Sequence, residues 1–182
     1  MDFEDPEVAQ LVASDIPVVT IDHIFNNRIA VMSDNVKGME SLLQFIYSRG
    51  HRRIAYIHGH ASSVTGSRLS SFYKTAEELL KLPCPPTCIL YPDDFSCLGG
   101  MNMLREKGLR IPEDISIAGY DGLRIGRHVE PKLTTLKQDT VKLGSYAAQK
   151  LIGQIERPKT SVPEIIVVEG EVYEGGSVGN IE

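Results

Sequence analysis

The chain has 182 residues, of which 42% are hydrophobic, and its formal net charge is −5. This length allows one large domain or two small lobes around a sizeable core. An acidic chain is a poor candidate for gripping nucleic-acid phosphates by itself, because such contacts need a basic face. The sequence has no run of 18 apolar residues, so we expect no membrane-spanning helix.

The N-terminal residues and the cysteines indicate the compartment. Residues 1–10 (MDFEDPEVAQ) are acidic and lack the apolar core of a signal peptide. Cys84, Cys88 and Cys97 contain no Cys-x-x-Cys pair, so we expect reduced thiols and no zinc. These features predict a cytoplasmic protein.

The chain alternates predicted strands with predicted helices, which implies parallel βαβ units and an α/β fold. The nearly continuous apolar runs fit parallel sheets that are buried on both faces. In chain order the expected elements are a strand at 16–22, a helix from the cap residues Asp34 and Asn35 to Gly50, a strand at 53–59, a helix at 68–82, a strand at 87–92, a helix at 94–108, a strand at 114–120, an extended segment at 133–139, a helix with Gly144, Ala147, Ala148, Leu151, Ile152 and Ile155 on one face, and a final strand at 164–173.

Polar side chains follow several of these predicted strands. In open parallel sheets, ligands bind beyond the carboxyl ends of the strands, so we expect these side chains to converge on one crevice. Carboxylates only accept hydrogen bonds and arginine only donates them. This mixture favours a neutral ligand rich in hydroxyls, such as a sugar or a nucleoside, over a polyphosphate. The side chains are those of Asp22, Ser62, Ser63, Thr65, Arg68, Asp93, Asp94 and Asp121.

Each of these residues also has a simpler structural interpretation. Asp94 directly precedes a helical stretch and is expected to be its N-cap, which leaves Asp93 to face a ligand or solvent. Asp22 could close a turn, and Arg68 could be a solvated helix residue. Asp121 precedes a segment too broken for an ordinary helix, so we expect a ligand-binding role there.

Enzyme signatures are missing from the sequence. It contains no phosphate-binding P-loop, no nucleophile elbow and no H-E-x-x-H zinc motif. His58 and His60 share one strand face, but no third metal ligand is evident. Ser62 and Ser63 lie near His60 in the sequence, but no third residue stands at a spacing that indicates a hydrolytic site. We therefore expect no enzymatic activity, no metal and no cofactor.

Four long segments resemble the effector-binding core of bacterial LacI/GalR (lactose-repressor) transcriptional regulators. The resemblance covers nearly the whole chain, and the combination of GLRIPEDISIAGYDG (108–122) with LTTLKQD (133–139) is highly specific for that family. The segments are IPVVTID (16–22), SDNVKGMESLLQFIYSRGHRRIAYIHG (33–59), PTCILYPDDFSCLGGMNMLREKGLRIPEDISIAGYDG (86–122) and PKLTTLKQDTVKLGSYAAQKLI (131–152).

The resemblance implies a periplasmic-binding-protein-like (type I) fold of two α/β lobes with parallel sheets. Three crossing strands would join the lobes, and a small effector would bind in the cleft between them. The core would form a homodimer, and the effector would set the operator DNA affinity of a separate N-terminal helix-turn-helix headpiece. We expect an N-terminal lobe of 1–32 and 138–162, a C-terminal lobe of 34–132 and 163–176, and crossings near 32–34, 134–137 and 161–163.

The resemblance also implies roles for individual residues. Arg68 matches the arginine of the family's R-x-x-G-F stretch, which reads RLSSF here, with Ser71 in place of the usual glycine. Asp121 matches the aspartate of the G-[YF]-D motif, and the glycines on either side would let the chain turn so that Asp121 faces the cleft. Asp93 holds a position that asparagine often fills. Weaker matches add the ligand-binding candidates Asp22, Thr65 and Gln138.

Two departures from the family pattern stand out. The chain opens part of the way into the family's core, so we expect the headpiece and the first strands of the N-terminal lobe to be absent and that lobe to be incomplete. In addition, SRLSSFYK (67–74) runs straight into TAEELLKLPCPPTCIL (75–90), where family members place a further strand and helix start. We expect either a break between Phe72 and Ala76 or a shortened lobe.

The sequence therefore predicts the effector-sensing core of a LacI-type regulator. An extracytoplasmic sugar-binding protein of a transporter, which has the same fold, is the alternative. A small α/β enzyme acting on a sugar or nucleoside is a further rival, although no convincing base or nucleophile is evident.

Overall fold

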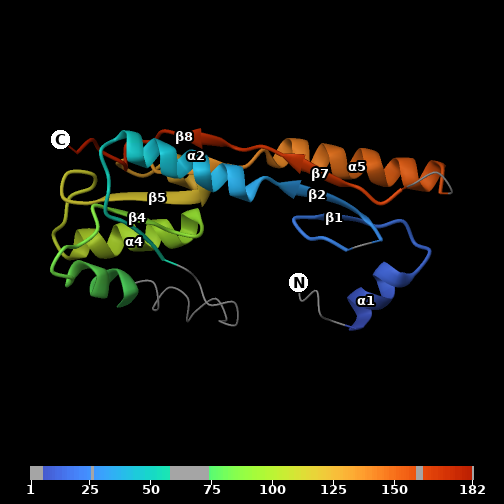
Figure 1. Ribbon diagram of the computed structural model, residues 1–182, viewed down its shortest axis with the longest axis horizontal. Helices are drawn as coiled ribbons and strands as arrows, with labels where there is room; N and C mark the ends of the chain where they lie inside the picture. The colour runs from blue at the N-terminus through green and yellow to red at the C-terminus, as the bar shows by residue number, and fades with distance from the viewer. Residues whose placement is uncertain (1–5, 26, 58–73, 159–161, 182) are drawn as a thin grey trace. The chain divides into compact units, whose positions relative to one another are not determined.

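The computed structural model describes residues 6–25, 27–57, 74–158 and 162–181 (Figure 1). The chain forms two compact units, one from residues 1–35 and 139–170 and the other from residues 36–138 and 171–182. The chain passes between the units at Asn35–Val36, Gln138–Asp139 and Gly170–Glu171. The correspondence of these units to the predicted lobes stays a prediction.

The first unit is a three-stranded parallel sheet with helices. The sheet order is β1-β2-β7, with Val19 opposite Ile29 and Ala30 opposite Ile165. Its small core consists of Val31, Leu143 and Val168, against which further apolar side chains of the sheet and of α5 pack. The elements are α1 (Pro6–Ala13), β1 (Val19–Ile21), β2 (Ile29–Ser33), α5 (Thr140–Glu156) and β7 (Ile165–Val168).

Arg28 fastens the end of α1 to this unit. Its Nε donates to the carbonyl oxygen of Val12 at 2.8 Å, its Nη1 donates to that of Ile16 at 3.1 Å, and its Nη2 donates to that of Ser14. The last carbonyls of a helix have no partner within the helix, so the guanidinium satisfies groups that would otherwise need water. Arg28 thereby holds α1 beside the start of β2.

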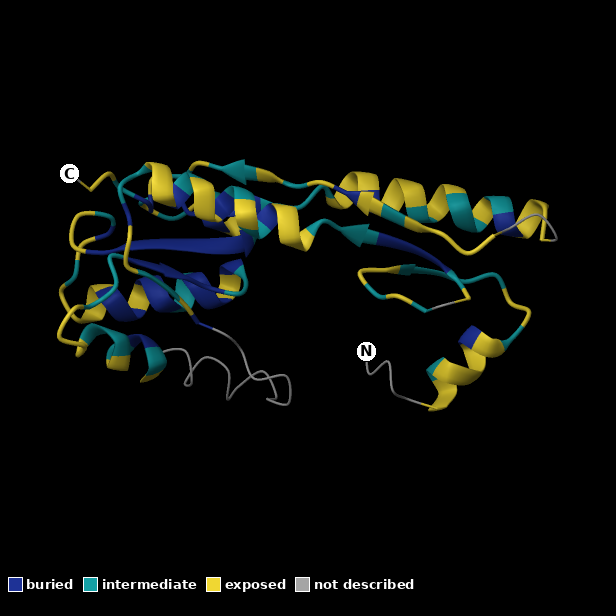
Figure 2. Cartoon of the chain, in the orientation of Figure 1, coloured by how far each residue is buried: buried dark blue, intermediate teal, exposed yellow. Residues whose placement is uncertain are grey.

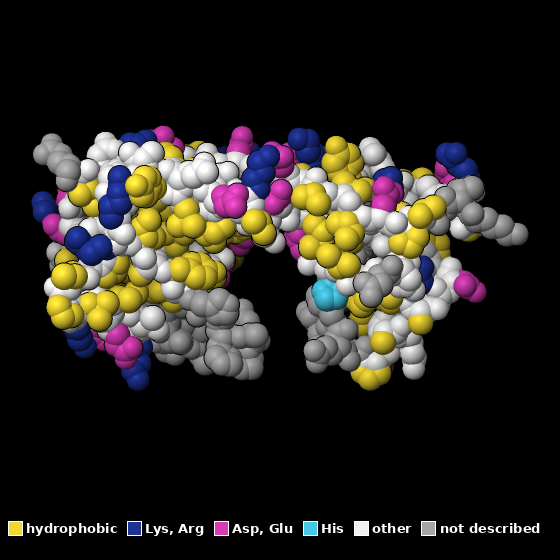
Figure 3. Space-filling view, in the orientation of Figure 1, with side chains coloured by type: hydrophobic (Ala, Val, Ile, Leu, Met, Phe, Trp, Pro, Cys, Tyr) yellow, Lys and Arg dark blue, Asp and Glu magenta, His cyan; other side chains and the backbone are white. Residues whose placement is uncertain are grey.

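The buried stripe of α5 differs from the predicted one. The helix buries Leu143 and Gln154, whereas Ile152 and Ile155 of the predicted face are 53% and 61% exposed (Figure 2). One face of a small sheet covers only a narrow stripe of a helix, so apolar residues outside that stripe stay at the surface. Hydrophobic side chains accordingly show at the surface of the first unit in Figure 3.

The second unit contains a five-stranded sheet with the order β3-β4-β5-β6-β8. The first four strands are parallel to one another, and β6 pairs with β8 in the antiparallel sense. Residues 74–80 are also helical. The elements are α2 (Asn35–Ser48), β3 (Ile54–Tyr56), β4 (Cys88–Leu90), α4 (Asp94–Glu106), β5 (Ser116–Asp121), the 3-10 turn η1 (Arg124–Arg127), β6 (Thr134–Lys137) and β8 (Glu171–Tyr173).

The sheet of the second unit is covered on both faces, as the apolar runs predicted. Because side chains alternate along a strand, Leu90 of β4 packs toward Leu42 of α2, whereas Ile89 packs toward Met101 of α4. Figure 1 shows α2 and α4 on opposite sides of the strands, and Figure 2 shows β4 and β5 as buried between them. Gly100 permits the close approach of α4, because a Cβ there would clash with the Tyr91 hydroxyl.

Several predicted elements need correction. The predictions missed α1 and β2, and the final strand at 164–173 is two strands that belong to different units. Gly170 separates them, so β7 pairs with β2 while β8 pairs with β6. Of the expected break between Phe72 and Ala76, residues 72 and 73 lie outside the described residues, and the chain is helical from residue 74 to residue 80. No helix in the described ranges is long and apolar enough to cross a membrane.

Candidate ligand-binding site

Three of the predicted site residues lie at the carboxyl edge of the second unit's sheet. Asp93 follows β4, Asp121 is the last residue of β5, and Gln138 follows β6 directly. The Nε2 of Gln138 donates a hydrogen bond to Oδ1 of Asp121 at 3.0 Å, and its backbone N–H donates to the Asp121 carbonyl at 3.3 Å. The structure thus brings Asp121 and Gln138 together.

Asp121 adopts a backbone conformation that is unusual for a residue with a side chain. Its φ is 106°, and that of Gly122 is 74°. Such values cost a non-glycine residue of order 1–3 kcal/mol and persist only where the surroundings hold them. At position 122 a Cβ would clash with the backbone of Lys137, so only glycine fits. The chain therefore turns sharply at 121–122, as the glycine at 122 predicted.

The predicted N-cap at Asp94 is wrong, because Asp93 caps the helix instead. Asp93 is the N-cap of α4: its Oδ1 accepts from the backbone N–H of Ser96 at 2.7 Å, and its Oδ2 accepts from the Ser96 hydroxyl at 2.8 Å. The expected cap, Asp94, is instead the first helical residue and is completely buried. The helix starts one residue earlier than a cap at Asp94 requires, which turns the Asp94 side chain into the protein.

Asp94 accepts hydrogen bonds inside the second unit. The Thr135 hydroxyl and the Leu123 backbone N–H each donate to its carboxylate at 2.6 Å. Burial raises the pKa of this carboxyl, while the hydrogen bonds from Thr135, Leu123 and Gly122 oppose that rise. Gly119 makes room for it, because a Cβ there would clash with Oδ1 of Asp94. The predicted turning role of Gly119 is therefore wrong: this glycine lies within β5 and accommodates a buried carboxylate.

The remaining predicted site residues are not part of this cluster as described. Asp22 belongs to the first unit, where it has a φ of 53° and follows β1. Its Oδ1 accepts from the Ser33 backbone N–H at 2.6 Å, so it closes the end of the β1–β2 pair. A ligand role for Asp22 stays a prediction. Thr65 and Arg68 lie outside the described residues.

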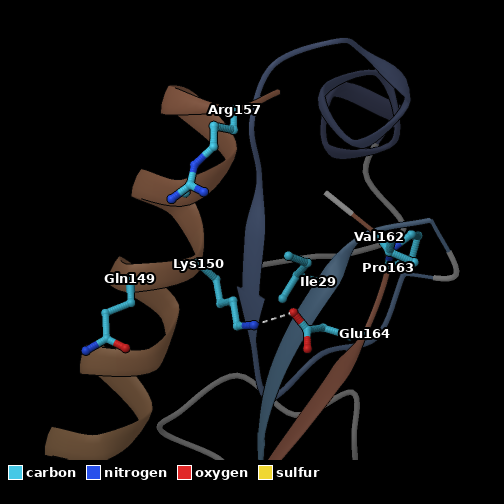
Figure 4. Close-up of a pocket in the computed structure, with 8 residues that line it drawn as sticks. Ile29, Gln149, Lys150, Arg157, Val162, Pro163 and Glu164 are labelled. Atoms are coloured by element: carbon cyan, nitrogen blue, oxygen red, sulfur yellow. Dashed lines mark hydrogen bonds and ion pairs between the residues drawn. The ribbon is translucent and has the colours of Figure 1, made fainter. Parts of the chain in front are cut away.

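The first unit has a hollow of about 350 Å³ at the opposite, amino-terminal end of its strands (Figure 4). Gln149 and Lys150 of α5 and its C-cap residue Arg157 border it on one side, and Glu164 before β7 borders it on the other. Lys150 Nζ already pairs with Glu164 Oε1 at 2.6 Å. Ligands of parallel sheets bind beyond the carboxyl ends, so this hollow is a weaker candidate than the edge with Asp121 and Gln138.

A second hollow, of about 500 Å³, lies at the amino-terminal end of β4 and β5 in the second unit. Its wall includes the buried His51, whose Nε2 donates to the Gly179 carbonyl at 3.1 Å and whose Nδ1 lies 2.9 Å from the Thr87 hydroxyl. Burial lowers the pKa of His51, and the hydrogen bond to Gly179 opposes that change. These contacts fix the last described residues against the sheet. Within the described ranges, no group of three His, Cys, Asp or Glu side chains could hold a metal ion.

Comparison with known proteins identifies the class. A family model described as a periplasmic binding protein-like domain matches residues 76–178, which is more than half of the chain. The "Probable HTH-type transcriptional repressor ExuR" of Bacillus subtilis is 27% identical over 91% of the chain. The HTH-type transcriptional repressor PurR of Escherichia coli is 30% identical over 83% of the chain. The chain spans 58% and 52% of the lengths of these two relatives.

A solved structure agrees with these matches. The LacI family transcriptional regulator from Enterococcus faecalis, with bound ribose, superimposes with a TM-score of 0.84 over 98% of this chain and 76% of that one, at 23% identity. The chain belongs to the periplasmic binding protein-like domain family, and its similarity to the two repressors supports the predicted effector-binding core of a LacI/GalR regulator. The predicted resemblance to LacI/GalR regulators and the predicted α/β fold with mostly parallel sheets are confirmed.

Proposed function

We propose that this chain senses a small effector for a LacI-type transcriptional regulator. The pairing of Asp121 with Gln138 at the carboxyl edge of a parallel sheet carries the proposal. The names of the repressor relatives support a regulator rather than a sugar-binding protein of a transporter or an enzyme. Operator DNA would be bound by an N-terminal helix-turn-helix headpiece of a homodimeric cytoplasmic protein.

The chemistry of the edge supports a neutral, hydroxyl-rich effector such as a sugar or nucleoside. Asp93 and Asp121 place carboxylates there, and these would repel a polyphosphate. A carboxylate has about four lone-pair sites, so Asp121 can accept from ligand hydroxyls in addition to Gln138. The bound ribose of the Enterococcus faecalis regulator is a ligand of this kind. Roles for Asp22, Thr65, Arg68 and Asp93, and a cleft between two lobes, stay predictions from the family resemblance.

Calorimetric titration of the full chain with D-ribose, D-glucose, D-galactose, cellobiose and adenosine tests this function. A hydrogen bond to a charged group is worth about 1.5–3 kcal/mol, and about 1.4 kcal/mol corresponds to tenfold in affinity. We therefore expect Asp121→Ala to weaken the tightest-binding compound by roughly one to two decades. Folding should change little, because the Asp121 side chain lies at the sheet edge and not in the core.

Two further variants sharpen this titration. Asp93→Asn keeps an N-cap oxygen for Ser96 while it removes one charge from the edge, so it separates capping from ligand contact. Asp114→Asn is the matched control, because Asp114 is a carboxylate paired with Arg110 before β5, away from this edge. Equal affinities for the original chain and for Asp121→Ala, with the fold intact, would contradict the proposed site. Failure of all five compounds to bind would contradict the proposed effector class.

A further inference from the structure

The buried carboxylate of Asp94 links the two segments that carry Asp121 and Gln138. Its donors are Leu123, two residues after Asp121, and Thr135, three residues before Gln138. The Gly122 backbone N–H donates in turn to the Thr135 hydroxyl oxygen at 3.3 Å. A carboxylate buried without such donors would be costly, so these contacts are what allow Asp94 to be charged inside the protein.

The sheet is built around this carboxylate. Gly119 and Thr135 are directly opposite each other in the β5–β6 pair, and both face Asp94: Thr135 donates to it and Gly119 leaves it space. Any residue with a Cβ at position 119 would displace the carboxylate. The sequence therefore provides a donor and a vacant position for Asp94 on neighbouring strands.

The turn that Asp94 holds is the one that orients Asp121. Asp121 has a φ of 106°, and such a conformation persists only where the surroundings hold it. The hydrogen bond from Leu123 to Asp94 holds the chain just after Asp121 against the start of α4, and the bond from Gly122 to the Thr135 hydroxyl holds it against β6. The Asp121 carboxylate then meets the Gln138 amide at 3.0 Å.

We propose that Asp94 is a positioning residue of the ligand site, which acts through Asp121 by fixing the 121–123 turn against α4 and β6. This inference rests on the proposed function for its ligand-binding consequence, whereas its structural part stands without a ligand. Asp94 itself contacts no effector in this account, because it is completely buried.

Hydrogen–deuterium exchange of the full chain without ligand tests the structural part. Asp94→Asn has nearly the same shape, but its amide replaces one acceptor oxygen by a donor, so either Thr135 or Leu123 loses its partner. We expect faster exchange in peptides that cover 119–125, with unchanged exchange in peptides that cover 86–91 of β4. Thr135→Val should give the same local pattern, and Thr135→Ser, which keeps the hydroxyl, should restore the original exchange.

Met103→Ala is the control for ordinary destabilisation. Met103 is buried in the core of the same unit, so its truncation should raise exchange across the whole unit rather than at 119–125. If Asp94→Asn gives that uniform pattern, or no change at 119–125, Asp94 is not a positioning residue. Either result would overturn the inference whether or not a sugar binds.

A double-mutant cycle tests the link to the ligand, with the tightest binder of the five compounds above as the probe. Asp94→Asn alone should weaken binding about tenfold, and it should change affinity by less than about twofold in the Asp121→Ala background. Equal losses in both backgrounds would show that Asp94 does not act through Asp121. If none of the compounds binds, the proposed effector class fails while the exchange experiment still decides the role of Asp94.

Discussion

The two units differ in how thoroughly their sheets are covered. In the second unit, helices pack on both faces of a five-stranded sheet, and β4 is buried along its whole length. In the first unit, α5 packs on one face of a three-stranded sheet, and Ile165 and Val167 of β7 are 53% and 55% exposed. The same alternation of strands and helices has therefore produced one deep core and one shallow core.

This difference determines which unit can hold the side chains of a ligand-binding site in fixed positions. A binding site needs side chains whose positions are fixed by packing and by hydrogen bonds behind them. In the second unit, Asp121 has such support from Asp94, Thr135 and the strands on either side. In the first unit, Asp22 is tied mainly to Ser33 at the end of a short strand pair. We therefore place the ligand-binding determinants chiefly in the second unit.

The largest expected effect is on the free energy of unfolding when an apolar side chain in the core of the second unit is truncated. A truncation in the sheet of the first unit is the comparison. Leu90→Ala should lower the free energy of unfolding by about 2–5 kcal/mol, because the Leu90 side chain of β4 is 1% exposed and packs toward α2. Val167→Ala should change it by less than about 0.5 kcal/mol, because that side chain is largely in water. Urea unfolding followed by circular dichroism measures both, and similar losses would contradict the contrast between the units.

A smaller effect is expected in the pH dependence of the second unit's stability. His51 is buried with a lowered pKa, so the unfolded chain, where its pKa is near the ordinary value of 6.5, takes up a proton more readily than the folded one. Stability from neutral His51 should therefore be complete above pH 6.5 and be lost as the pH falls toward the folded pKa. Unfolding by urea over this pH range measures it.

His51→Gln is the matched variant for that experiment, because its amide can still donate to the Gly179 carbonyl. The variant should be less stable at neutral pH but should lose less stability on acidification. Identical pH dependence in the two proteins would show that His51 does not contribute. Carboxylates titrate in both proteins alike, so the difference between the two curves isolates the histidine.

The smallest perturbation is chemical labelling of the cysteines. Cys84 is exposed, whereas Cys88 and Cys97 are buried in the second unit. Burial raises the pKa of Cys88 to about 12 and also raises that of Cys97, so neither forms the reactive thiolate at neutral pH. A thiol reagent should modify Cys84 quickly, and it should modify Cys88 and Cys97 only when the second unit unfolds. Fast modification of two or three thiols in the folded chain would contradict the deep core.

The fold was largely predictable from sequence because its strongest signals are local. The apolar runs of β4 and β5, the glycine after α2 and the alternation of strands with helices identified the second unit as a parallel α/β sheet. The first unit was predicted less well, because β2 is an apolar run of five residues and α1 a helix of eight residues, and runs this short do not show whether they form a helix or a strand. The split of 164–173 depends on which strands β7 and β8 pair with, which no local pattern contains.

The candidate site was predictable in position but not in detail. The spacing of strand ends identified Asp93 and Asp121, and the family motif added Gln138, which contacts Asp121. The position of the N-cap at Asp93 instead of Asp94 was not predictable, because either aspartate satisfies the preferences of an N-cap. The contact between Asp94 of α4 and Gly119 of β5 joins residues that come together only in the folded protein. A glycine within a strand beside a carboxylate at a helix start was the available signal.

The central claim is that an effector binds at the carboxyl edge of the second unit's sheet. Amide NMR spectra of the isotope-labelled chain, titrated with the tightest binder among the five compounds, test it most directly. The largest shifts should come from Asp94, Leu123 and Gln138, whose amides lie at this edge. Shifts confined to Gln149–Arg157 and Glu164, around the hollow of the first unit, would contradict the account.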